Sequence, residues 1–105
     1  MAISIKTIKQ DSNPTGLTSG NEYIWEVGQN TVVSIQGNPT VAGTARVKYS
    51  LSSSTPTDFT GFVTSNAGDH STDFGEKSDV GSGIRWIGVE IDSGTWTVLI
   101  KQTKV

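Results

Sequence analysis

Apolar and polar residues alternate most regularly near the end of the chain, between Ile84 and Ile100. Alternation with a period of two is typical of β-strands, and the turn residues 92–94 divide this stretch into two of them. The apolar phase changes beside Gly88, as it does at a β-bulge. Because apolar residues occupy both faces, we predict two central strands joined by a tight turn. The apolar positions are Ile84, Trp86, Ile87, Val89, Ile91, Trp96, Val98 and Ile100.

Earlier segments are mostly apolar on one face only, and turn residues separate them at roughly 8–12 residues. These segments are residues 2–9, 22–27, 31–36 and 44–51. Tyr23, Trp25 and Val27 are expected to face inward. Glu22 and Glu26 are expected to face outward. We therefore predict an all-β protein: an antiparallel β-sandwich, jelly-roll or Ig-like, with a closed β-barrel as the second choice.

Composition limits the classes of partner. The chain has 105 residues, which corresponds to one domain, and a net charge of −2 with its Lys and Arg residues scattered. A nucleic-acid-binding protein more often shows a basic stripe, so we expect no nucleic-acid partner. The absence of cysteine fits a cytosolic origin or a particle assembled inside a cell. We also expect no membrane partner, because no apolar run approaches a bilayer-spanning length and residues 1–10 do not form a signal peptide.

Residues 52–82 are the least regular part of the chain, with few alternating positions. An unstructured loop of this length is unusual inside a compact domain. Either the segment contains short edge strands around Phe62 and Phe74, or it is a functional arm that orders against a partner. We describe the chain as a single domain, 1–105, with an irregular loop or arm at about 52–82.

Aromatic residues in this irregular segment are candidates for contact with a partner protein. Phe59, Phe62 and Phe74 lie outside the regular strands, where an aromatic side chain either fills a core or anchors an interface. The N-terminal strand adds Ile3 and Ile5, because an edge strand can pair with a neighbouring chain. The sequence therefore assigns these five residues as partner-binding candidates.

No pattern of catalytic residues is present, and we predict no enzyme activity and no cofactor. Residues 69–73, Asp-His-Ser-Thr-Asp, contain the residue types of a hydrolytic triad, but consecutive loop residues cannot easily point at one another. The oxygen ligands that calcium prefers are available from an acidic stretch, although their spacing does not match the EF-hand pattern. That stretch contains Asp69, Asp73, Glu76 and Asp79. We expect no metal site, with a calcium-dependent adhesion module as the weaker alternative.

The three tryptophans suggest a second alternative, a carbohydrate-binding module, because sugars pack on exposed aromatic faces. Trp25 and Trp96 occupy inward phases of alternating strands, and Trp86 lies in the strand that is apolar on both faces. Core packing is favoured for each of them. The carbohydrate interpretation requires at least one of the three to be exposed.

Three stretches resemble the small, cysteine-free β-sandwich structural proteins of tailed bacteriophage particles. They are Arg46–Ser53, Gly83–Ile87 and Ser93–Val98. The resemblance covers the second half of the chain and transfers no catalytic residues. It implies a capsid decoration (cement) protein, or a minor head or tail protein, that binds the major capsid protein or other virion proteins. It also implies a homo-oligomer on the capsid surface of a virion assembled in the host cytoplasm.

Overall fold

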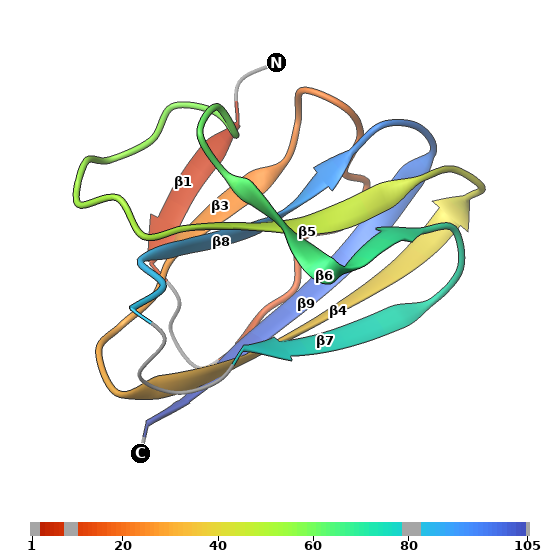
Figure 1. Ribbon diagram of the computed structural model, residues 1–105. Helices are drawn as coiled ribbons and strands as arrows, with labels where there is room; N and C mark the ends of the chain where they lie inside the picture. The colour runs from red at the N-terminus through yellow and green to blue at the C-terminus, as the bar shows by residue number, and fades with distance from the viewer. Residues whose placement is uncertain (1–2, 8–10, 79–82, 105) are drawn as a thin grey trace.

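The computed structural model describes residues 3–7, 11–78 and 83–104, and these form strands and loops without a helix (Figure 1). Since no described residue is helical, no described segment is a helix long and apolar enough to cross a bilayer. The all-β prediction is therefore confirmed. The strands are β1 Ser4–Thr7, β2 Asp11–Ser12, β3 Tyr23–Glu26, β4 Thr31–Val41, β5 Ala45–Ser50, β6 Val63–His70, β7 Phe74–Ser78, β8 Trp86–Ile91 and β9 Thr95–Lys104.

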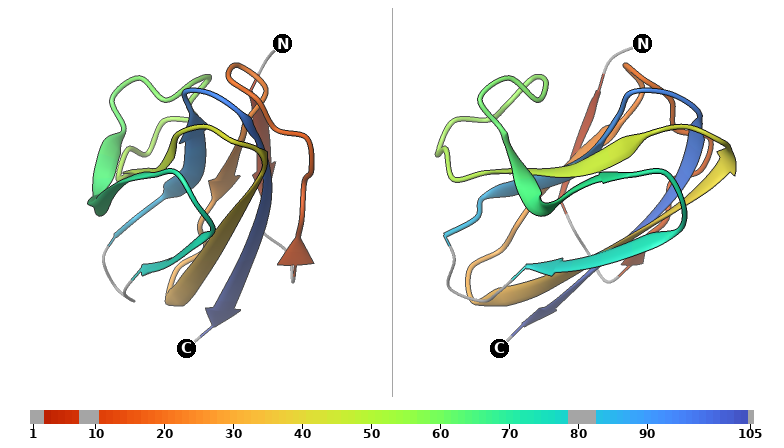
Figure 2. Two further views of the ribbon diagram at one scale, coloured as in Figure 1. Left: turned by 90° about the vertical axis from the view of Figure 1, so that its right-hand side faces the viewer. Right: turned by 45° about the vertical axis from the view of Figure 1, so that its right-hand side comes forward.

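The strands form two sheets. Sheet A has five strands in the order β1-β3-β8-β5-β6, and sheet B has four in the order β2-β9-β4-β7 (Figure 1; Figure 2). Neither sheet closes on itself within the described residues, so the second choice, a closed barrel, is not what this chain forms.

The strand pairs are nested along the chain. β5 pairs with β6, β4 with β7, β3 with β8, and β2 with β9, always antiparallel. Successive pairs alternate between sheet A and sheet B. β1 is outside this series and adds to the edge of sheet A, parallel to β3. Because pairs distant in sequence end in the same sheet, the fold depends on long-range contacts throughout.

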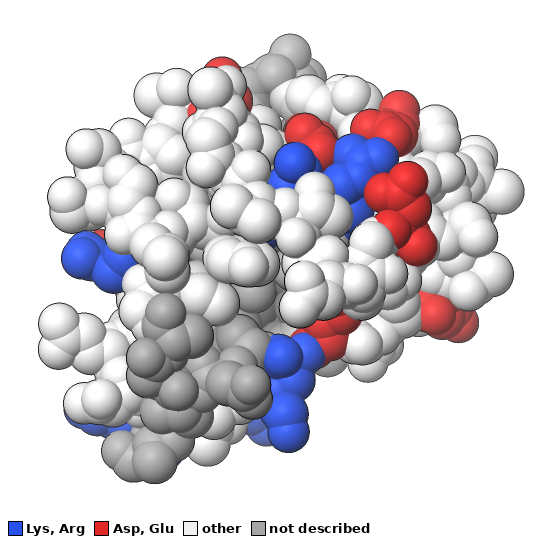
Figure 3. Space-filling model, in the orientation of Figure 1, with Lys and Arg blue, Asp and Glu red and all other residues white. Residues whose placement is uncertain are grey.

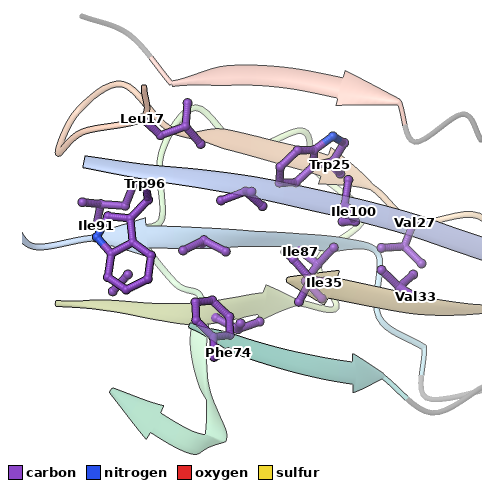
Figure 4. Close-up of a cluster of buried hydrophobic side chains, with 14 residues drawn as sticks. Leu17, Trp25, Val27, Val33, Ile35, Phe74, Ile87, Ile91, Trp96 and Ile100 are labelled. Atoms are coloured by element: carbon purple, nitrogen blue, oxygen red, sulfur yellow. The ribbon is translucent and has the colours of Figure 1, made fainter. Parts of the chain in front are cut away.

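A shared core of buried side chains joins the two sheets (Figure 4). Trp25 of β3 and Trp96 of β9 are fully buried there, one from each sheet, as their inward phases predict. Leu17 closes one side through a bridge to Trp96. Other members of the core are Val27, Val33, Ile35, Ala45, Val47, Phe74, Ile87, Val89, Ile91, Val98 and Ile100.

The stretch 84–100 contains two central strands, as predicted, but two details of the prediction are wrong. β8 lies in sheet A and β9 in sheet B, so they are not a hairpin. The register of β8 with β5 is also continuous through Gly88, and its register with β3 is regular up to Gly88, so there is no bulge. Ile87 points into the core between the sheets, while Trp86 points to the opposite face of sheet A. The apolar phase therefore changes along β8 because both faces of this regular strand are covered by apolar side chains.

The irregular segment 52–82 contains two strands, which is the first of the two alternatives. β6 is the edge of sheet A and β7 is the edge of sheet B. The β5–β6 register shifts between Arg46 and Lys48, and Gly68 has a φ of 73° within the additional β6 residues. This local irregularity explains why the sequence shows no clear alternation here.

Glycines in two strands provide a matched test of this packing. A Cβ at Gly88 would lie 2.6 Å from the carbonyl oxygen of Tyr23 and 2.9 Å from the Phe59 ring, whereas a Cβ at Gly75 meets nothing within 4 Å. We expect Gly88→Ala to lower the free energy of unfolding by about 1–3 kcal/mol, because backbone of an adjacent strand must move. Gly75→Ala should change it by less than about 0.5 kcal/mol. Urea denaturation measures both, and equal effects would contradict the close approach at Gly88.

Candidate functional site

A second apolar cluster covers part of the outer face of sheet A, the face turned away from sheet B. Its buried members are Ile24 of β3, Trp86 of β8 and Phe59 of the loop 51–62. Ile3, Ile5 and Phe62 pack against them and are only partly buried. Strand alternation produces this cluster, because Ile24 and Trp86 have the opposite phase from Trp25 and Ile87.

The loop 51–62 is fixed over this face by hydrogen bonds and aromatic contacts. The Trp86 indole Nε1 donates to the carbonyl of Ser52 at 2.9 Å. The Phe59 and Phe62 rings meet edge to face at 5.3 Å, and the Phe62 amide donates to the Phe59 carbonyl at 3.0 Å. The missing side chain of Gly88 leaves room for the Phe59 ring beside β8. The loop therefore presents Phe62 at a fixed position beside the buried base of the cluster.

The structure brings four of the five partner-binding candidates together at this cluster. Ile3 and Ile5 reach it from the first strand and its approach, and Phe59 and Phe62 reach it from the loop. Phe74 lies elsewhere, in the core between the sheets. Sequence reasoning singled out these residues but missed their convergence, because no local signal shows that β1 and the loop cover the same face.

Phe74 instead helps to close one side of the two-sheet structure. Its ring fills the space over Gly37, where a Cβ would lie 2.2 Å from the ring. The His70 ring stacks on it at a centroid distance of 4.0 Å, and His70 Nε2 lies 2.6 Å from Glu76 Oε2. Because β6 carries His70 and β7 carries Glu76, this contact links the edges of the two sheets.

The other part of the same outer face carries an ion-pair network around Arg46 of β5. Arg46 donates to Asp69 Oδ1 of β6 at 2.8 Å and to Glu90 Oε1 of β8 at 2.7 Å. It also bonds both carboxylate oxygens of Asp92. Lys48 lies 3.7 Å from Glu90. Figure 3 shows cationic side chains enclosed by acidic ones on this face. The outer face of sheet A is therefore apolar in one part and charged in the other.

Glu22 is buried at the beginning of β3, contrary to the outward orientation that alternation predicts. Its side chain is 3 % exposed, and its Oε2 accepts a hydrogen bond from the amide of Ile91 at 3.1 Å. The β3–β8 ladder ends at Ile24 and Gly88, so the carboxylate takes the place of a strand partner for Ile91. Burial, with a smaller effect from the Glu90 charge, raises the pKa of Glu22 above its ordinary value.

The alternative sites suggested by the sequence are not assembled among the described residues. No group of three or more His, Cys, Asp or Glu side chains there can hold a metal ion. Asp69 pairs with Arg46 and Glu76 with His70, while Asp79 lies outside the described residues. Within the described residues, the side chain of His70 contacts Glu76 and Phe74, and forms no hydrogen bond with Ser71 or Asp73.

None of the three tryptophans offers a face to a sugar. Trp25 and Trp96 are fully buried in the core, and Trp86 is 4 % exposed beneath the loop. The tryptophan-stacking form of the carbohydrate hypothesis is therefore wrong for this fold.

Comparisons with known proteins do not place the chain in a family: no family model, no curated protein and no solved structure matches it.

The Arg46 network predicts a pH-dependent stability. The hydrogen bond from Arg46 lowers the pKa of Asp92, so the ionised pair stabilises the fold above the ordinary carboxyl pKa and this contribution is lost as the pH falls through the lowered pKa. Asp69 and Asp92 are 61 % and 53 % exposed, so the pairs are screened. We expect Arg46→Gln to lower the free energy of unfolding by about 1–2 kcal/mol at neutral pH and by less in acid. Thermal melts across pH test this.

Lys48→Gln is the matched control, because it removes one positive charge from the same strand but loses only the longer contact to Glu90. Lys48→Gln should lower the free energy of unfolding by less than Arg46→Gln does. An Arg46→Gln effect that is independent of pH would show that packing of the guanidinium, and not its charge, stabilises the face.

Glu22 predicts the opposite pH dependence. With a raised pKa, the native state binds a proton where the unfolded state does not, so the buried charge lowers stability as the pH rises through the raised value. Glu22→Gln keeps an oxygen acceptor for Ile91 without the charge. We expect its melting temperature, relative to the native chain, to be higher at neutral pH than in acid.

Glu26→Gln, on the same strand, controls for the change in net charge. A Glu22→Gln variant that loses more stability at neutral pH than in acid would contradict the assignment of a buried, unfavourable charge.

Proposed function

We propose that this chain is a non-enzymatic structural protein of a bacteriophage virion, specifically a capsid decoration protein that binds the major capsid protein and stabilises the shell. The observation that carries this proposal is the apolar cluster on the outer face of sheet A. Ile3, Ile5 and Phe62 are partly exposed there, above a buried base of Ile24 and Trp86. Apolar side chains that stay exposed side by side on a surface are typical of a site of contact with another protein.

The surroundings of the cluster support an interface. The Arg46 network lies on the same face, so a partner would meet apolar contacts beside a charged region. Protein interfaces commonly combine an apolar centre with a polar rim. Charged groups at such a rim orient the partner and set the rate of association more than the affinity.

The order of the strands supports a jelly-roll form of the β-sandwich, rather than the Ig-like form. The support is the nested series of four antiparallel pairs, whose successive members alternate between the sheets. Jelly-roll domains occur in viral capsid proteins and in lectins. The fold alone does not choose between those functions, so the proposal depends on the surface.

Homo-oligomerisation on the capsid is part of the proposal, and the sheet edges are where it would occur. β1 and β6 are the edges of sheet A, and β7 is an edge of sheet B. An edge strand exposes backbone donors and acceptors to a neighbouring chain. β7 is a regular strand of five residues, whereas β6 pairs with an interrupted register, which makes β7 the better candidate.

Particle composition tests this function directly. We expect the chain to sediment with virions, with a copy number close to that of the major capsid protein by quantitative mass spectrometry. Phe62→Ser should reduce its occupancy on particles about tenfold, because it removes an aromatic anchor. Val41→Ser is the matched control, since Val41 is a 58 % exposed apolar residue on β4 of the other sheet.

Thermal melts of both variants establish that each is folded before its occupancy is compared. Absence of the native chain from particles would overturn the proposal. Equal occupancy of folded Phe62→Ser and Val41→Ser would overturn the assignment of this face as the contact surface.

A further inference from the structure

The outer face of sheet B contains a hollow of about 360 Å³ that crosses three strands. Its volume falls within the range of small-molecule sites. The hollow lies on the opposite sheet from the apolar cluster, and it does not depend on the virion proposal. The side chains and the glycine that shape it are Ser34, Gln36, Gly75, Lys77, Leu99 and Lys101.

Strand register explains why the surface is hollow at this point. Gln36 of β4 lies opposite Gly75 of β7 on one side and opposite Leu99 of β9 on the other. Gly75 has no side chain, and a Cβ there would meet no atom within 4 Å. These three residues form a row across the sheet: Gly75 leaves a gap on the edge strand β7, the Gln36 amide lies in the middle on β4, and the apolar Leu99 side chain follows on β9.

The next row places two cations beside this gap. Ser34 lies opposite both Lys77 of β7 and Lys101 of β9, so the two lysine Cα atoms are about 10 Å apart. Within the described part of the chain, neither lysine forms an ion pair. These charges stand out in a chain of net charge −2.

The remaining polar groups favour a ligand with hydroxyls as well as a negative charge. Gln36 Nε2 donates to Asn38 Oδ1 at 2.9 Å, which fixes the amide and leaves its oxygen as an acceptor. Ser34 adds a hydroxyl that both donates and accepts. Glu76 also borders the hollow, but its carboxylate Oε2 is engaged by His70 at 2.6 Å.

We infer that this hollow is a binding site for an acidic saccharide, a sugar unit that carries a carboxylate. Lys77 and Lys101 bind the carboxylate, because charge-assisted hydrogen bonds are the strongest polar contacts available on this face. Ser34 and Gln36 bind ring hydroxyls. The saccharide enters the space that Gly75 leaves open on one side of Gln36, and an apolar part of it packs on Leu99 on the other side. The site uses none of the tryptophans.

Titration of the full chain with trigalacturonate tests this inference, followed by amide chemical shifts in a proton–nitrogen NMR spectrum. We expect saturable shifts at residues 34–36, 75–77 and 99–101, with affinity that falls as salt is added. Neutral maltotriose should bind at least about tenfold more weakly, because it lacks the charged contact. Inorganic phosphate should also bind more weakly, because it cannot use Ser34, Gln36 and Leu99 together.

Variants separate the parts of the site. Lys77→Gln and Lys101→Gln should each raise the Kd for trigalacturonate about tenfold. Gly75→Val should abolish binding by filling the gap while preserving the fold, since valine is favoured in strands and its Cβ has free space. Lys104→Gln is the matched charge control, because Lys104 is on β9 but does not line the hollow, and it should leave the Kd nearly unchanged.

Three results would overturn the inference. Absence of saturable shifts would show that the hollow is not a site. Equal affinity for phosphate and trigalacturonate would show that the lysines bind any anion. Unchanged affinity in folded Gly75→Val would place the ligand elsewhere on the chain.

Discussion

Burial of one face of each sheet against the other is the constraint on which the rest of this structure depends. Trp25 and Trp96, one from each sheet, are among the largest fully buried side chains, and each burial stabilises the fold by about 2–3 kcal/mol. Because the strand pairs are nested, each of the two sheets that enclose this core contains strands that are distant in sequence. Loss of complementarity inside this core, such as at the close approach of Gly37 to the Phe74 ring, therefore weakens packing on which both sheets depend.

The same pairing creates a second problem on the outer face of sheet A, where Ile24 and Trp86 must also be covered. The loop 51–62 and the N-terminal strand provide that cover, but incompletely, so Phe62 and Ile5 remain partly exposed. A cover that also leaves apolar surface for a partner is compatible with a protein that assembles on a larger particle. The proposed role in a virion rests on this feature of the surface, and not on the fold.

Charge is distributed unevenly between the two layers. The Arg46 network places three carboxylates on the outer face of sheet A, whereas Lys77 and Lys101 border the hollow on the outer face of sheet B. The two proposals therefore assign partners of different chemistry to the two faces: a protein surface to sheet A and an acidic saccharide to sheet B. Between them, the contact of His70 with Glu76 ties the edges of the sheets together.

Alternation in the sequence determined the all-β class, the positions of the central strands and the inward orientation of Trp25 and Trp96. Alternation wrongly predicted a bulge at Gly88 and an outward-facing side chain for Glu22. It did not distinguish between a core position and a partner contact for Phe74. A period of two shows which residues share a face, but not what covers that face. The segments that cover a face, and the strands that pair with a given strand, come from distant parts of the chain. Only the tertiary structure therefore decided that β8 and β9 lie in different sheets. It also decided that β1 and the loop 51–62 meet at one site.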